Sequence, residues 1–118
     1  MNHLIALTFT AEAQATGAGV FEFQLPRNFT IVHVSLCVEA YASSGSTCNV
    51  DIQDDGTDVI TAVTANTAGT PGTWEATHVG GTETPVTIAA DSSIEVDLNL
   101  DQGTADFTLI ILGLLGEV

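Results

Sequence analysis

The acidic run at 51–58 is the part of the sequence whose residue types come closest to a metal site. Asp51, Asp55 and Gly56 match the first, fifth and sixth positions of a calcium-binding loop. Ala62, however, stands where that loop needs a bidentate glutamate, and the flanking segments alternate like strands rather than helices. We therefore interpret the run as a hairpin turn with solvated carboxylates, and we predict neither a metal nor a cofactor.

Two other sets of residues have types that occur in catalytic sites. His33 and Cys37 would lie about 13 Å apart along one strand, whereas a nucleophile and its base must approach to about 3 Å. Glu95 and Asp97 have the chemistry of a glycosidase acid and base, but such a site needs aromatic platforms for the sugar, and the chain has one Trp and one Tyr. The three histidines lack the close spacing of a metal pair. We predict that the protein is not an enzyme.

Tyr41 and Trp74 are the candidates for contact with a ligand. Both lie beside loops rich in Gly, Ser and Thr, at 43–46 and 67–72. An exposed aromatic ring near a loop tip can stack on a sugar or anchor a protein partner. The alternative, which we favour, is that these rings cap one end of a hydrophobic core.

The charge of the chain excludes two classes of partner. Asp and Glu number 15 against a single basic residue, Arg27, which gives a formal net charge of −14. Binding to nucleic acid or to an anionic membrane surface depends on Lys and Arg, so we predict neither partner. No segment reaches the roughly 18 apolar residues of a membrane span, and the first residues lack the basic start of a signal peptide. We expect synthesis in the cytoplasm without secretion.

Alternation of apolar and polar residues predicts the elements that carry these side chains. It is most regular at 31–40, at 47–53 and at 94–100, and Asp55-Gly56 predicts a tight hairpin after the second of these. In the first segment, one face is predicted to be apolar: Val32, Val34, Leu36, Val38 and Ala40. Shorter strands are predicted at 4–9, 20–25, 58–63, 73–79, 86–89 and 107–115, with a loop at 11–19.

This pattern predicts an all-β fold. Eight or nine short strands separated by turn signals, with no helical period, are typical of an antiparallel two-sheet β-sandwich, here jelly-roll-like. We expect one domain over 1–118.

Cys37 and Cys48 are predicted to point to opposite sides of their strands, so they should not form a disulfide. Cys48 would be a small core residue and Cys37 a free thiol, as in a reducing compartment.

The segment at 107–115 is unusual because it is apolar on both faces. A monomeric sandwich buries only one face of a strand, so the second face must be covered by a loop or by another subunit. We favour a subunit contact, with 4–7 as a possible partner strand. The predicted interface consists of Leu4, Ile5, Leu7, Phe107, Leu109, Ile110, Ile111, Leu112, Leu114 and Leu115.

The order of turns and strands resembles a known class of proteins. The segments at 25–36, 50–60, 86–98 and 107–113 follow the pattern Leu-Pro, strand, Asp-Gly-Thr, Ala-Ala-Asp, strand, strand. This pattern is similar to that of the small β-sandwich domains of tailed-bacteriophage virions, which occur as capsid decoration proteins, head fibres and tail-fibre modules. The shared positions are turns and core positions, so no functional residues carry over.

The resemblance implies a structural role outside the particle. The first hypothesis is a non-enzymatic protein that decorates and stabilises a capsid as a symmetric homo-oligomer, such as a trimer. Its partners would be itself and the major capsid protein or another virion protein. The alternative is a tail-fibre or carbohydrate- or receptor-binding module that uses Trp74 or Tyr41.

Overall fold

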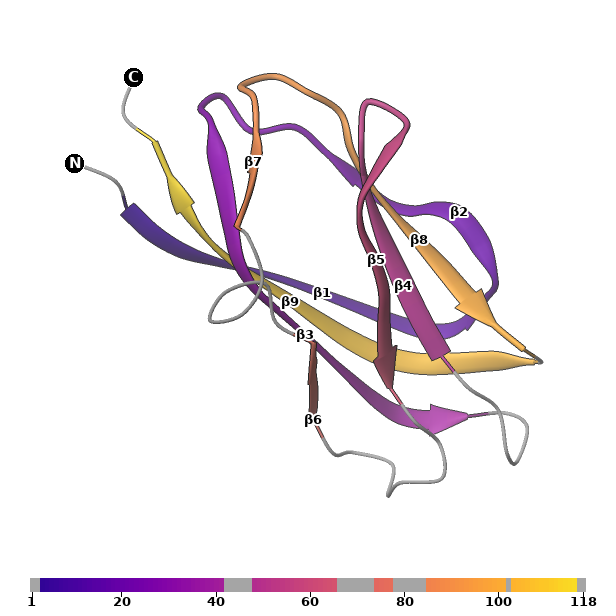
Figure 1. The fold of residues 1–118 in the computed structure, drawn as a ribbon. Helices are drawn as coiled ribbons and strands as arrows, with labels where there is room; N and C mark the ends of the chain where they lie inside the picture. The colour runs from indigo at the N-terminus through magenta and orange to yellow at the C-terminus, as the bar shows by residue number, and fades with distance from the viewer. Residues whose placement is uncertain (1–2, 42–47, 66–73, 78–84, 102, 117–118) are drawn as a thin grey trace.

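The computed structural model describes residues 3–41, 48–65, 74–77, 85–101 and 103–116. Within them it is built of β-strands, drawn in Figure 1. The strands are β1 (His3–Ala15), β2 (Gly17–Phe23), β3 (Phe29–Tyr41), β4 (Cys48–Asp54), β5 (Thr57–Ala65), β6 (Trp74–Thr77), β7 (Val86–Ile88), β8 (Ile94–Leu100) and β9 (Thr104–Leu115). The described residues include no helix of the length and hydropathy needed to cross a membrane.

The strands form two antiparallel sheets that pack face to face. Sheet A has the order β1-β9-β3-β6, with β7 also pairing with β3, and sheet B has the order β2-β8-β4-β5. Four antiparallel pairs, β1 with β9, β2 with β8, β3 with β6 and β4 with β5, are the steps of one long two-stranded ribbon wound into two sheets. This winding is a jelly roll, so the predicted fold class is confirmed.

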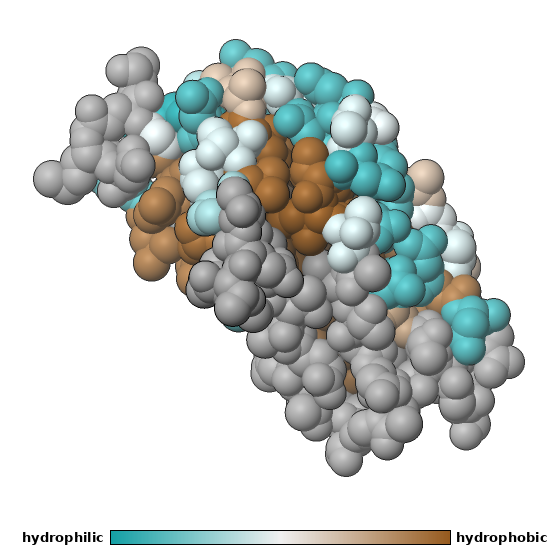
Figure 2. Space-filling view, in the orientation of Figure 1, coloured by the Kyte–Doolittle hydropathy of each residue, from teal (hydrophilic) through white to brown (hydrophobic). Residues whose placement is uncertain are grey.

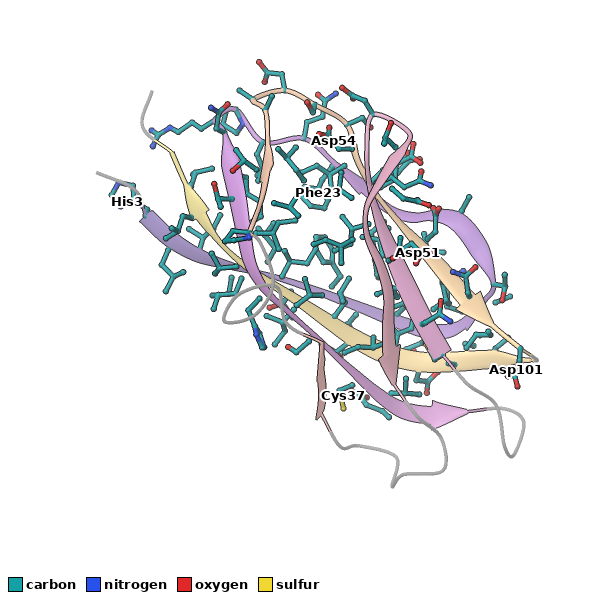
Figure 3. The ribbon with its side chains drawn as sticks, viewed as in Figure 1. His3, Phe23, Cys37, Asp51, Asp54 and Asp101 are labelled. Carbon is teal, nitrogen blue, oxygen red and sulfur yellow. The ribbon has the colours of Figure 1, made fainter. Side chains whose placement is uncertain are left out.

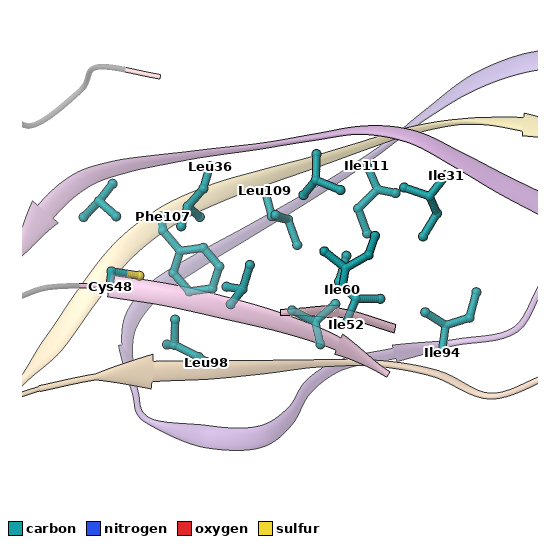
Figure 4. Close-up of a cluster of buried hydrophobic side chains, with 14 of the residues drawn as sticks. Ile31, Leu36, Cys48, Ile52, Ile60, Ile94, Leu98, Phe107, Leu109 and Ile111 are labelled. Atoms are coloured by element: carbon teal, nitrogen blue, oxygen red, sulfur yellow. The ribbon is translucent and has the colours of Figure 1, made fainter. Parts of the chain in front are cut away.

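The core lies between the two sheets and consists of the residues that alternation turns inward. Figure 4 shows side chains of sheet A, including Leu36, Phe107 and Leu109, facing Ile52 and Leu98 of sheet B. All five of these are completely buried. Phe9 extends the core toward the β1 edge, where its ring centroid lies 4.9 Å from that of Phe21 and 5.2 Å from that of Phe23. Tilted rings at these distances make favourable contacts.

Two bulges in β3 change which residues face the core. The register between β3 and β9 shifts between Ile31 and His33 and again between Val38 and Ala40. An extra residue at a bulge reverses the alternation beyond it. The prediction that Val32 and Ala40 share the inward face was therefore wrong: Ile31 is completely buried, whereas Val32 is half-buried and Ala40 is exposed.

The segment predicted as a loop at 11–19 is instead largely extended. β1 continues to Ala15, with a register shift against β9 between Ala11 and Gln14, and β2 begins at Gly17. Ala13 has φ of 47°, and its N–H donates to Asp106 Oδ1 at 2.6 Å. Thr16 lies between the strands, and its hydroxyl accepts a hydrogen bond from the Leu100 N–H at 2.8 Å. Small residues thus let one extended segment cross between the sheets.

The hairpin between β4 and β5 forms where the sequence predicts it. Asp55 and Gly56 have φ of 49° and 85°, as a tight turn of this kind requires. The tip is fixed to the neighbouring turn, because the Asp55 N–H donates to the Ser93 carbonyl at 2.8 Å and the Ser93 N–H donates to Asp55 Oδ1 at 2.7 Å. β3 and β4 belong to different sheets, so Cys37 and Cys48 do not lie on neighbouring strands.

Candidate functional site

The outward face of sheet A is apolar where β1 and β9 run side by side. Leu4 lies opposite Leu114, Ala6 opposite Leu112, and Thr8 opposite Ile110. Leu4 is 61% exposed, Ala6 is exposed, and the three β9 side chains are half-buried. Figure 2 shows brown, hydrophobic residues at the end of the molecule where β1 begins and β9 ends. We call this surface the apolar face; its residues are Leu4, Ala6, Ile110, Leu112 and Leu114.

The charged side chains of sheet A that the structure describes lie away from the apolar face. Glu39 is near the other end of β3, where its Oε1 accepts a hydrogen bond from the Thr108 hydroxyl at 3.1 Å. Asp106 is opposite Ala40, and Glu12 is in the bulged part of β1. The apolar face itself carries no carboxylate. In a chain of net charge −14, such a surface is where another protein can approach with the least electrostatic repulsion.

The structure divides the ten predicted interface residues into three groups. Leu4, Ile110, Leu112 and Leu114 point outward and belong to the apolar face. Ile5, Leu7 and Leu115 are partly buried and pack against the core. Phe107, Leu109 and Ile111 are completely buried in the core of the chain itself, so they have no surface to offer a partner. Ala6 shares the outward side of β1 with Leu4, and its pairing with Leu112 places it in the apolar face.

Cys37 also lies on the outward side of sheet A, between Leu36 and Val38, which face the core. It is nevertheless only 4% exposed, and both it and Cys48 are free thiols, as predicted. Figure 3 shows Cys37 on β3, near β6. Burial, and secondarily the negative charge of Glu39, raises the pKa of Cys37. Burial raises the pKa of Cys48 to about 12. Neither thiol is therefore activated as a nucleophile.

The outward face of sheet B is acidic. Across its strands, Asp51 lies directly opposite Asp97, and Glu95 lies opposite Glu22 on one side and Gln53 on the other. Like charges opposite each other in a sheet are destabilising. Figure 2 shows teal, hydrophilic residues on this side. We call this surface the acidic face; its charged residues are Glu22, Asp51, Asp58, Glu95 and Asp97.

Hydrogen bonds hold several of these carboxylates in place. Asp97 Oδ1 accepts the Gly19 N–H at 2.8 Å, and Asp58 Oδ1 accepts a bond from Gln53 Nε2 at 2.8 Å. Asn99 Nδ2 donates both to Asn49 Oδ1 and to Asp51 Oδ2, each at 3.1 Å. Neutral donors between the carboxylates reduce the cost of bringing them together. The face is therefore a solvated surface with a defined arrangement of charges.

The residues considered for metal binding or catalysis do not converge in the part of the chain that the structure describes. Among the described residues, no three His, Cys, Asp or Glu side chains form a group that could hold a metal ion. Asp51 lies on the acidic face (Figure 3), whereas Asp55 binds the turn at Ser93. His33 lies opposite Leu112 in sheet A, beside the apolar face.

The two candidate ligand contacts are placed only by their backbone. Tyr41 ends β3 opposite Ala105, and Trp74 begins β6 opposite Cys37. Their side chains, His78 and the loops at 43–46 and 67–72 lie outside the described residues. Their role in ligand binding therefore stays a prediction.

The fold and its two faces define an antiparallel jelly roll with one apolar and one acidic outer surface. No protein-family model matches the sequence, and no curated protein sequence matches it. Among solved structures, the chain is similar to one in the "Acidic stable capsid structure of Helicobacter pylori bacteriophage KHP30". That match has a TM-score of 0.58 and 16% identity, and it covers 98% of this chain and 89% of that chain.

A second similar chain belongs to a structure of infectious bursal disease virus, Gt strain. It has a TM-score of 0.41 and 17% identity, and the match covers 96% of this chain but 32% of that chain. At 16% identity, the likeness to the bacteriophage chain concerns the fold alone.

Proposed function

We propose that this chain is a non-enzymatic structural protein of a phage virion that decorates the outside of the capsid as a homo-oligomer. The observation that carries the proposal is the contrast between the apolar face and the acidic face on opposite sides of one sandwich. An exposed apolar sheet surface on a small protein is typical of a protein–protein contact. The likeness in fold to a chain of a phage capsid structure, over nearly its full length, supports a place in a virion.

The charge supports the outer surface of the particle rather than the inside. Packaged DNA is a dense array of phosphates, and a protein of net charge −14 would be repelled by it. With the apolar face against the particle, the acidic face is directed to solvent. The proposed partners are therefore further copies of the chain, and the major capsid protein or another virion protein, which binds at the apolar face.

Immunogold labelling tests the location. Antibodies raised against the purified chain should label the heads of intact particles released from a host that carries the gene. Labelling of tails alone, or labelling only after particles are disrupted, would contradict decoration of the capsid exterior.

Binding to particles tests the surface. Particles produced without the chain are mixed with purified protein and sedimented. Leu112→Asp places a carboxylate in the apolar face and should reduce binding at least tenfold. Thr61→Asp makes the same change of charge at an exposed position of β5 in sheet B, and it should bind like the unmodified protein. Equal binding by both variants would exclude the apolar face as the contact.

A further inference from the structure

The four edges of the two sheets differ in how well they are protected from pairing with another strand. Unprotected edges present unpaired N–H and C=O groups, and proteins usually block them with short strands, charges, proline, glycine or bulges. At the far edge of sheet A, β6 has 4 residues and β7 has 3, and Pro85 precedes β7. That edge is too short to accept a long strand.

Both edges of sheet B are also protected. β2 carries Glu22 and has a register shift between Gly17 and Phe21, with Gly19 at φ of 60°. β5 carries Asp58, and its pairing with β4 is irregular around Ile52. Charges and irregular register each disfavour addition of a further strand.

The edge formed by β1 is different over most of its length. From His3 opposite Leu115 to Ala11 opposite Phe107, β1 pairs with β9 without any shift. This stretch, His-Leu-Ile-Ala-Leu-Thr-Phe-Thr-Ala, contains no Gly, Pro, Asp, Glu, Lys or Arg. Among the described strands, β9 alone pairs with β1, so the other edge of β1 is open. Protection returns only beyond it, at Glu12 and the bulge with Ala13 at φ of 47°.

We propose that the open edge of β1 at 3–11 pairs antiparallel with the same edge of a second copy of this chain. The pairing that uses the whole stretch is centred on Leu7, so that Ile5 lies opposite Phe9 and Leu4 opposite Thr10 of the other copy. Odd-numbered residues then lie opposite odd-numbered ones, and even-numbered residues opposite even-numbered ones. The inward side of one sheet therefore continues into the inward side of the other. The two copies would share one continuous sheet of β6-β3-β9-β1 and its symmetric repeat.

Charge distribution favours a second copy at this edge. Each chain carries a net charge of −14, yet 3–11 includes no carboxylate, so two copies can approach here without placing acidic groups side by side. The contact is isologous, and because the other edges are protected it closes at two copies instead of growing into a fibre. At about 3.3 Å per residue the shared edge is about 30 Å long. Such a small interface should dissociate in the micromolar range or above.

This inference deepens the proposed function, since it names the surface by which copies join, but its experiment uses the purified chain alone. Sedimentation at increasing protein concentration should show twice the 12.2 kDa mass of one chain. The dimer fraction should increase with salt, because salt screens the repulsion between two acidic chains. A chain that remains monomeric up to millimolar concentration, a trimer as the main species, or a dimer weakened by salt would each overturn the proposal.

Three variants compare pairing at the edge with packing of the apolar face: Ala6 belongs to both, whereas Leu112 belongs to the apolar face alone. Ala6→Lys puts a charge on the open edge and should reduce dimerisation at least tenfold, whereas Thr61→Lys, with the same change of charge on β5, should not. Leu112→Asp lies on β9, one strand away from the edge, and should also leave the dimer intact. Loss of the dimer in Leu112→Asp but not in Ala6→Lys would show that copies pack through the apolar face, and would overturn the inference.

Hydrogen exchange supplies a readout that a face contact would not change. In the monomer, the β1 amides at 3–11 that point away from β9 should exchange rapidly. In the dimer the same alternate amides should become protected, because they donate to the partner strand. Unchanged exchange at those amides in a sample that is mostly dimer would overturn the proposal. Absence of the chain from particles would contradict the proposed function and leave this result untouched.

Discussion

The two outer faces of this sandwich are built on the same strand geometry but have opposite chemistry. On sheet A, the residues that point away from the core where β1 meets β9 are aliphatic or small, and Leu4 is 61% exposed. On sheet B, the corresponding positions carry carboxylates that lie directly opposite each other, such as Asp51 and Asp97. Neither the exposed apolar residues of sheet A nor the facing carboxylates of sheet B favour the stability of an isolated chain. The difference is consistent with the proposal that one face makes contact with another protein while the other keeps the chain soluble.

The largest expected effect separates the two sides of β9. Leu109→Ala removes a completely buried side chain and should lower the free energy of unfolding by about 2–5 kcal/mol. Ile110→Ala changes its half-buried neighbour on the apolar face and should cost about 1 kcal/mol or less. Urea unfolding of both variants measures this. Similar losses would mean that the apolar face is structural in the lone chain and not a free surface.

A smaller effect is expected at Gly113, which lies on the inward side of β9. A Cβ there would lie 2.7 Å from the Thr30 carbonyl oxygen and would also meet the ring of Phe29. Gly113→Ala should therefore destabilise the fold by about 1–3 kcal/mol, through overpacking. Gly56→Ala is a useful comparison, because it has open space around it and is strained only by its φ of 85°. Thermal melting should show a lower melting temperature for Gly113→Ala than for the unmodified protein. An unchanged melting temperature would contradict the close packing.

Because the Cys48 thiol is buried, the stability of the fold should decrease at alkaline pH. Its ordinary pKa of 9.0 is raised to about 12 by burial. Between these values the unfolded chain loses the proton and the folded chain keeps it. Stability that is fully present below pH 9 should therefore decrease toward pH 12, by at most about 1.4 kcal/mol per pH unit. Cys48→Ala should remove this component in urea titrations from pH 8.5 to 10.5; parallel curves would contradict it.

The smallest effect tests the acidic face. Glu95 lies opposite Glu22, so Glu95→Lys replaces a repulsive cross-strand pair with an attractive one and should stabilise the fold by about 0.2–1 kcal/mol. Glu12→Lys makes the same change of net charge in the bulged part of β1, away from the acidic face. An equal gain in both variants would show that the total charge matters, and not the arrangement on sheet B.

The sequence predicts those parts of the fold that depend on local pattern. The alternation at 94–100 gives β8 with its bounds, and Asp55-Gly56 gives the hairpin, because both are decided by neighbouring residues. Alternation alone places Val32 on the wrong face, because a bulge depends on how β3 pairs with β9. The small residues of 11–19 are poor strand formers and predict a loop, yet pairing with β9 keeps β1 extended to Ala15.

The candidate surface was predictable only in part, for the same reason. The apolar character of both faces of 107–115 is visible in the sequence, and it led to Leu4, Ile110, Leu112 and Leu114. Which residues belong to the core, such as Phe107, is decided by the packing of sheet B onto sheet A. The acidic face could not be predicted, since Glu22 and Glu95 are neighbours only because β2 pairs with β8.

The pairing of β1 with β9 joins the beginning of the described chain to its end, with His3 opposite Leu115 (Figure 1). During translation at 5–20 residues per second, the first strand would wait on the order of 5–20 s for its neighbour to leave the ribosome. Until then both of its edges are open, and the hydrophobic stretch at 3–11 is available to chaperones and to other nascent chains. Contacts between such distant segments also make for slow folding. The yield of native protein should therefore depend on growth temperature and chaperone supply more than its modest size suggests.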